Sequence, residues 1–152
     1  MVTQIMQNNK DEPQRAIDPF RVVVVDDSAG IRGLISRWLE EDPDIAVVAT
    51  ASNGQMALNS LVSSDAEVVV LDIEMPVMDG LTALPRMLRE VPDVQVLMAS
   101  TLTSRNAEIS MKALGLGAAD YVPKPESNRE VTGNSAFRRE IVDKVRALAG
   151  AR

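Results

Sequence analysis

The stretch VVVLDIEMPVMDG, residues 68–80, predicts a buried strand that ends in a carboxylate, because four apolar residues lead directly into Asp72. A carboxylate is costly to remove from water unless another group pairs with it. The earlier stretch RVVVVDDS, residues 21–28, repeats the pattern, with four valines leading into Asp26 and Asp27. Two strands that end in this way predict that their acids serve one shared site.

Apolar runs alternate with helical patterns from about residue 20 to residue 149. Five strands are expected at 21–26, 45–50, 67–72, 94–100 and 118–125, and five helices at 28–41, 53–64, 81–91, 104–117 and 135–150. Five strand–helix units of this length predict an α/β fold in which a doubly wound, five-stranded parallel sheet is covered by helices on both faces.

Several single residues carry expectations about these helices. We expect Ser28 to be the N-cap of the first helix, and Met56, Leu61 and their neighbours to face inward from the second. Pro85 is expected to lie near enough to the start of the third helix to be tolerated. Gly115 and Gly117 suit a left-handed end to the fourth helix.

Composition restricts the class of protein. At 152 residues the chain is long enough for one domain with a substantial core. A net charge of −6 argues against a DNA-binding surface, because phosphate binding draws on clustered Lys and Arg. The chain has no cysteine, no signal-peptide pattern and no apolar run long enough to cross a bilayer, so we expect a cytoplasmic protein without membrane insertion. Residues 1–19 are polar and aperiodic, and we expect a flexible tail there.

The chain contains no histidine, and this absence excludes more classes of functional site than any other feature of the composition. It rules out Ser-His-Asp or Cys-His catalysis, a His-bound zinc ion and a phosphohistidine carrier within this chain.

Parallel sheets of this kind bind ligands beyond the carboxyl ends of their strands. Asp27, Asp72, Ser100 and Lys124 all follow strand ends, so we expect them to converge. Carboxylates gathered within about 5 Å repel by roughly 3 kcal/mol per pair at an effective dielectric near 20, and Mg²⁺ would reverse that sign. Carboxylates, a divalent cation, a lysine and a hydroxyl together indicate phosphoryl-transfer chemistry with an aspartate nucleophile.

Simpler interpretations exist for each signal alone. Asp26 and Asp27 could be acids favoured at a helix start, and Lys124 could be a solvated loop lysine. Ser100 could simply end its strand, and Asp79-Gly80 is most simply a turn. The chain contains no GxxxxGK[ST] loop, and acids replace the glycine fingerprint after the first strand. The joint order and strand-end placement of these residues favours the shared site.

In combination, VVVVDDS, VVVLDIEMPVMDG, VLMAS and YVPKP resemble the receiver domain of two-component response regulators, which has a flavodoxin-like fold. The resemblance covers about residues 20–149 and leaves 150–152 as a domain end or the start of a linker. It implies that Asp72 accepts a phosphoryl group from the phosphohistidine of a sensor histidine kinase. It also implies roles for further residues: Asp27, Asp72 and the Glu74 backbone carbonyl as Mg²⁺ ligands, Asp26 as a ligand through water, Lys124 and Ser100 at the phosphoryl group, and Tyr121 with Ser100 as the switch pair.

A narrower resemblance is to the receiver half of the chemotaxis response-regulator protein-glutamate methylesterases. Glu74, two residues after the acceptor, and the STLT run at 100–103 fit that subfamily. The resemblance implies that phosphorylation switches a surface that regulates a C-terminal methylesterase domain absent from this chain. We expect no enzyme activity from the chain itself, whereas a full-length parent could be a methylesterase/deamidase. We also expect Lys124-Pro125 to be a cis peptide.

Three other interpretations stay open at this point. The chain could be a stand-alone, single-domain regulator that docks on another effector protein. A Mg²⁺-dependent aspartyl phosphatase would use similar groups, but its nucleophile usually follows the first strand. A purely structural or binding module is disfavoured by the cost of clustered, unpaired carboxylates.

Overall fold

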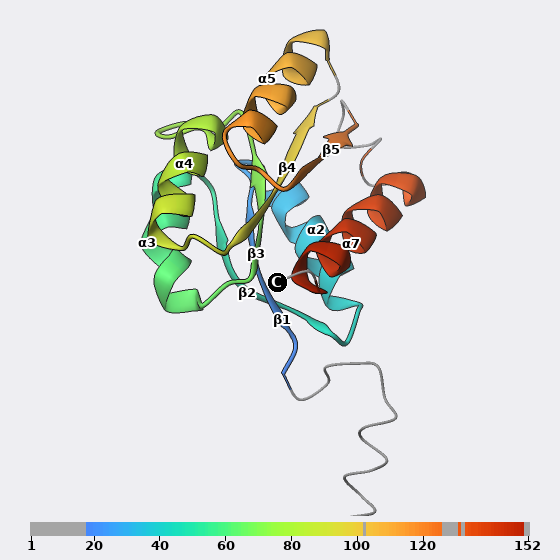
Figure 1. Ribbon diagram of the computed structural model, residues 1–152. Coiled ribbons are helices and arrows are strands. Elements are labelled where there is room, and N and C mark those ends of the chain that lie inside the picture. Colours follow the sequence, from blue (N-terminus) through green and yellow to red (C-terminus); the bar gives the residue numbers. More distant parts are fainter. Residues whose placement is uncertain (1–17, 102, 126–130, 132, 151–152) are drawn as a thin grey trace, which may run out of the picture.

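The computed structural model describes residues 18–101, 103–125, 131 and 133–150 (Figure 1). The tail expected at 1–19 therefore lies almost entirely outside the described residues, as does the chain end at 151–152. Within the described part, no helix combines the length and the apolar character needed to span a membrane.

Five parallel strands form one sheet in the order β2-β1-β3-β4-β5, which confirms the predicted fold class. The strands are β1 (Phe20–Val25), β2 (Ile45–Ala51), β3 (Val68–Asp72), β4 (Gln95–Thr101) and β5 (Asp120–Lys124). The helices between and after them are α2 (Ala29–Glu40), α3 (Gly54–Ser64), α4 (Gly80–Glu90), α5 (Ser104–Gly115) and α7 (Ser135–Gly150). In Figure 1, α2 and α7 lie on one face of the sheet and α3, α4 and α5 on the other.

The continuous valine run of β1 is explained by burial on both faces of the sheet. Val22 and Val24 belong to the core under α2 and α7, whereas Val23 and Val25 belong to the core under the other three helices. Successive strand residues point to opposite faces, so a central strand covered on both sides has no polar positions. The first polar residue after this strand stands at its carboxyl end, where Asp26 is only 2% exposed.

Two of the local expectations are confirmed. Ser28 caps α2, and its hydroxyl oxygen accepts a hydrogen bond from the Ile31 backbone N–H at 3.3 Å. Of the two glycines expected at the end of α5, Gly115 is its last helical residue, and Gly117, just beyond the helix, has a φ of +114°, which glycine adopts without steric cost.

Two other local expectations need correction. Leu61 is buried as expected, but Met56 is 48% exposed, and Ala57 completes the buried stripe of α3 in its place. Helical geometry allows residues 57 and 61 to share one face, which leaves residue 56 at its edge. Pro85 is the sixth residue of α4 and not in its first turn. The helix continues to Glu90 without the hydrogen bond that a residue at that position would donate to the preceding turn.

The loop between β3 and α4 holds a strained residue whose replacement should stabilise the fold. Val77 has a φ of +68° and is 83% exposed. A left-handed conformation costs a residue with a branched Cβ roughly 1–2 kcal/mol. We predict that Val77→Asn raises the free energy of unfolding by about 1 kcal/mol, because asparagine tolerates this conformation and little packing is lost.

Urea unfolding of the purified chain measures this effect. Val62→Asn is the matched control, because Val62 is 64% exposed on α3 but helical. Valine and asparagine have similar helix propensities, so we expect almost no change there. Equal effects of the two substitutions would contradict the assignment of strain to Val77.

Candidate functional site

The acids gather at the point in the sheet where the strand order reverses. β1 lies between β2 and β3, and open α/β sheets bind ligands in the crevice that this arrangement leaves at the carboxyl ends. Asp26 and Asp27 follow β1, and Asp72 is the last residue of β3. Carboxylate oxygens of the three residues lie within 4.8 Å of one another. The predicted convergence is therefore confirmed for these acids.

A cavity of about 230 Å³ lies over the acids and takes in the other predicted site residues. Ser100 from the end of β4 and Lys124 from the end of β5 line it, together with Glu74 from the loop after β3. Tyr121 does not line this cavity. Every residue predicted to bind the metal ion or the phosphoryl group therefore lines this cavity, whereas the predicted switch aromatic, Tyr121, lies elsewhere.

Lys124 is the buried cation of the site. Its ammonium nitrogen, Nζ, donates to Asp26 Oδ2 at 2.9 Å and lies 3.4 Å from Asp72 Oδ1. The side chain is 10% exposed, so the interpretation of Lys124 as a solvated loop residue is wrong. The cavity is lined by this one ammonium group and by several carboxylates, so it keeps an excess of negative charge.

The expectation of a cis bond before Pro125 is also wrong. All peptide bonds of the described residues are trans, including Lys124–Pro125. Lys124 ends β5 with its side chain already at the acids, so the backbone need not reverse to bring it there. The trans form is also the intrinsically preferred one for an X-Pro bond.

The donor set fits a Mg²⁺ ion. The contacts of Asp72 with described residues fall on Oδ1, which accepts from the Ile73 backbone N–H at 2.8 Å and faces Lys124, so Oδ2 remains available. Asp27 is exposed toward the cavity, and Glu74 contributes to its wall. Asp26 is engaged on both oxygens, since Ser28 N–H donates to Oδ1 at 2.9 Å and Lys124 to Oδ2. Hard oxygen donors with excess negative charge are what Mg²⁺ requires, and the engagement of Asp26 suits a ligand that acts through water.

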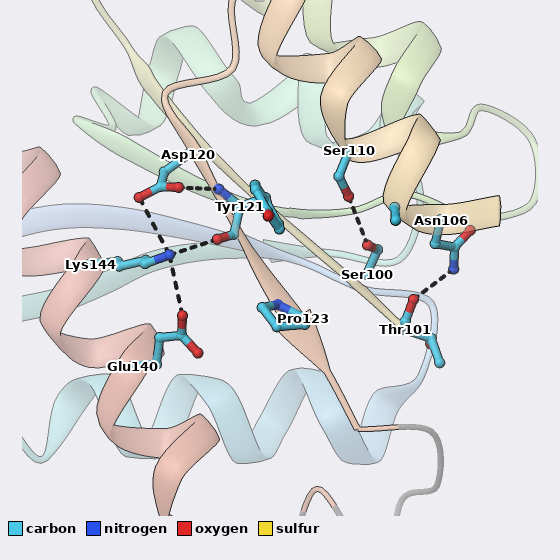
Figure 2. A pocket seen from close by; sticks show the side chains of 10 residues that line it. Ser100, Thr101, Asn106, Ser110, Asp120, Tyr121, Pro123, Glu140 and Lys144 are labelled. Carbon is cyan, nitrogen blue, oxygen red and sulfur yellow. Dashed lines mark hydrogen bonds and ion pairs between the residues drawn. The ribbon is translucent and has the colours of Figure 1, made fainter. Parts of the chain in front are cut away.

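A second cavity, of about 410 Å³, lies between β4, β5, α5 and α7 (Figure 2). Ser100 and Tyr121 both line it, and Tyr121 is 36% exposed. Lys144 from α7 donates to the Tyr121 backbone carbonyl at 2.8 Å, and its Nζ lies 5.8 Å from the centre of the ring. The two cavities share Ser100, Thr101 and Asn106, which form the wall between them.

Comparison with known proteins identifies the family of the chain. The sequence model of the response regulator receiver domain matches residues 22–134. The chain belongs to the response regulator receiver family.

In sequence the receiver is similar to a part of several larger proteins. It is 60% identical over 139 residues to a protein-glutamate methylesterase/protein-glutamine glutaminase of Rhodospirillum centenum, covering 91% of this chain and 35% of that protein. It is also 60% identical over 134 residues to the corresponding protein of Azospirillum brasilense, covering 88% of this chain and 34% of that one. The chain thus spans about a third of the length of the curated relatives it matches.

Two solved structures extend the likeness to three dimensions. The response regulator domain of Thermotoga maritima CheB superposes with a TM-score of 0.75 at 33% identity, covering 87% of this chain and 97% of that one. The CheX-CheY-BeF₃-Mg²⁺ complex from Borrelia burgdorferi gives a TM-score of 0.71 at 25% identity, covering 86% and 90% of the two chains. The receiver is of the chemotaxis type that methylesterases of this kind carry.

Sequence reasoning missed two features of the receiver site. Gly80 was interpreted as an ordinary turn residue, but a Cβ there would stand 2.1 Å from the Asp72 backbone oxygen, so only glycine fits. Asn106 is 4% exposed in the wall between the cavities, where its amide donates to the Thr101 carbonyl at 3.0 Å. The MDG turn was a visible signal for Gly80, whereas nothing in the sequence pattern marks Asn106.

The ionisation of Asp72 follows from its surroundings. Burial raises the pKa of Asp72 from 3.8 to about 7, and the attraction of Lys124 offsets only part of the rise. The carboxylate of Asp26 raises it further. Burial also opposes the charge on Lys124, but the carboxylates of Asp72 and Asp26 raise the pKa of Lys124 above its ordinary value.

These directions predict how the stability of the metal-free receiver depends on pH. Folded Asp72 keeps its proton up to about pH 7, whereas the unfolded chain releases it near pH 4, so ionisation destabilises the fold as pH rises between these values. The loss is at most about 4 kcal/mol, because one pKa unit corresponds to about 1.4 kcal/mol. Asp72→Asn should remove this loss, leaving the variant more stable than the wild type at pH 8 but not at pH 4.

Thermal unfolding in EDTA across pH 4–8 measures the difference. Parallel stability curves for the two proteins over this range would show that Asp72 does not titrate as its burial requires.

Proposed function

We propose that Asp72 is the phosphoacceptor of this receiver and takes its phosphoryl group from the phosphohistidine of a sensor histidine kinase. The observation that carries the proposal is the buried Asp72 carboxylate, which faces Lys124 in an acid-lined cavity at the reversal point of the sheet. A carboxylate with raised pKa, a fixed ammonium group and excess acidic oxygens suit phosphoryl transfer better than a purely structural role.

Each residue of the site has its own role in the phosphoryl transfer. A carboxylate oxygen of Asp72 attacks phosphorus, an O–P bond forms, and the bond between phosphorus and the kinase histidine nitrogen breaks with its electron pair on nitrogen. Lys124 is placed to contact a phosphoryl oxygen from its position beside Asp72. The Mg²⁺ ion would be held by Asp27, Asp72 and the Glu74 carbonyl, with Asp26 acting through water. When bound, it supplies positive charge that favours ionised Asp72 and offsets the charge of the phosphoryl oxygens.

Phosphorylation would be read out through Ser100 and Tyr121. A phosphoryl group adds about 1.5–2 negative charges and strong acceptor oxygens, which draw the Ser100 hydroxyl toward Asp72. Ser100 also lines the second cavity, so its departure changes the space beside Tyr121. An inward rotation of Tyr121 would then alter the surface formed by α5, β5 and α7.

The output in a full-length protein would be regulation of a methylesterase domain. Support comes from relatives at 60% identity that are protein-glutamate methylesterases and of which this receiver spans about a third. Such a protein would act in the cytoplasm with a chemotaxis-type kinase. The chain itself would be a phosphoacceptor and not the esterase, because it has no histidine to serve a serine nucleophile.

Acetyl phosphate with Mg²⁺ should add a single, hydrolytically labile phosphoryl group to the purified chain, and Asp72→Asn should prevent this. Intact-mass spectrometry measures the adduct. Asp79→Asn is the matched control, because Asp79 is an exposed acid seven residues further on that caps α4, and asparagine caps equally well.

Full modification of Asp72→Asn would refute the assignment of Asp72. Hydrolysis of many equivalents of an ordinary phosphate ester would instead indicate the aspartyl phosphatase alternative.

Mg²⁺ should raise the thermal stability of the chain, and Asp27→Ala should remove most of this rise. Binding to the folded state alone stabilises by about 2.7 kcal/mol at a concentration 100-fold above the Kd. Differential scanning fluorimetry with and without Mg²⁺ measures the shift. Asp143→Ala is the control, since Asp143 is exposed on α7 and does not line the acid cavity. An undiminished response in Asp27→Ala would place the metal site elsewhere.

A further inference from the structure

Ser110, which the proposed mechanism does not use, makes a hydrogen bond with Ser100. The two hydroxyl oxygens lie 3.3 Å apart, and the residues are 2% and 5% exposed. Figure 2 shows the two side chains pointing toward each other, one from α5 and the other from β4. The Ser100 hydroxyl is therefore held toward α5 although its residue also lines the acid cavity.

Other serines on helices behave differently. Ser36 donates to the Arg32 carbonyl at 2.7 Å, and Ser60 donates to the Met56 carbonyl at 3.3 Å, each bonding one turn back in its own helix. This is the usual way for a helical serine to satisfy its hydroxyl group. Among the described residues, Ser110 bonds only to Ser100. Its hydroxyl is thus directed at the switch residue.

The bond opposes the movement that phosphorylation requires. A hydroxyl group has one proton to donate. If Ser100 is the donor in this pair, that proton is already engaged; if Ser110 is the donor, it holds the Ser100 oxygen in a rotamer aimed at α5. In both cases Ser100 must leave Ser110 before it can donate to a phosphoryl oxygen on Asp72.

We propose that Ser110 is a positioning residue that holds the Ser100 hydroxyl away from Asp72 and so sets the affinity of the receiver for its phosphoryl group. The inference rests on the proposed function of Asp72 and adds to it the residue that biases the resting state. Ser110 touches neither Asp72 nor the acids that line its cavity, and it acts through Ser100 alone.

The bond can be exchanged because Ser110 has other acceptors within its own helix. The Asn106 backbone carbonyl lies one turn back, the position that Ser36 and Ser60 use in their helices. The buried side-chain oxygen of Asn106, on the same helix face, has no hydrogen-bond partner among the described residues. Release of Ser100 therefore need not leave the Ser110 hydroxyl unsatisfied, and the bond biases the switch without locking it.

The test is the Kd of the intact chain for beryllofluoride, a phosphoryl mimic, in saturating Mg²⁺, measured from the bound ¹⁹F NMR signal. Ser110→Ala should bind roughly 2- to 10-fold more tightly than the wild type, the factor expected for one net hydrogen bond lost from the resting state. Ser110→Thr, which keeps the hydroxyl, should bind like the wild type. Ser60→Ala is the control for loss of a helical serine hydroxyl elsewhere and should leave the Kd unchanged.

A double-variant cycle separates positioning from a general effect on folding. In a Ser100→Ala background there is no hydroxyl to hold, so adding Ser110→Ala should no longer tighten binding. Tightening that persists in this background, or equal Kd values for wild type and Ser110→Ala, would overturn the proposal while leaving the role of Asp72 intact. If the wild type does not bind beryllofluoride, or if Asp72→Asn still binds it, the proposed function is refuted, and the role of Ser110 with it.

Discussion

The central constraint on this structure is the placement of three carboxylates where two neighbouring buried strands end. Asp26, Asp27 and Asp72 bring like charges together at the carboxyl edge of the sheet, with Lys124 as the buried cation among them. Burial, and to a lesser extent the neighbouring Asp26 carboxylate, raises the pKa of Asp72, so its ionised form costs free energy in the metal-free fold. Stability that a metal-free fold loses in this way is available as binding free energy for a divalent cation and a phosphoryl group.

The rest of the fold keeps this charged edge rigid. The central strands are covered on both faces, so their ends cannot shift without disturbing one of two packed cores. The close approach at Gly80 holds the start of α4 against the backbone of Asp72. The acceptor carboxylate is thereby fixed from its own strand and from the helix that follows.

The wall between the two cavities connects the charged site to the surface of α5, β5 and α7. It is built from polar residues, and one of its acceptors, the side-chain oxygen of Asn106, is buried without a partner among the described residues. Polar side chains with more than one possible partner can exchange bonds at small cost, whereas an apolar wall would offer no such alternatives. A bistable element of this kind is what a local charge change needs in order to alter a distant surface.

The sequence by itself determined the fold class and the identity of the charged residues. Valine runs without polar positions require strands covered on both faces, and acids at the ends of β1 and β3 can only meet if the sheet is parallel. Helix periodicity is less decisive: it predicts Leu61 correctly but places Met56 inward, whereas the small residue Ala57 takes that place in the buried stripe of α3.

Only the tertiary structure decided which groups touch. Lys124 reaches Asp26 and Asp72 from the end of β5, and its bond to Pro125 is trans; this depends on where β5 ends relative to β1 and β3. The Asp72 backbone leaves no room for a side chain at Gly80, and Ser100 pairs with Ser110. In both cases the packing of two elements brings the groups into contact. A strand or helix pattern records which face a side chain occupies, but the partner it meets there is set by the distance and angle at which the elements pack.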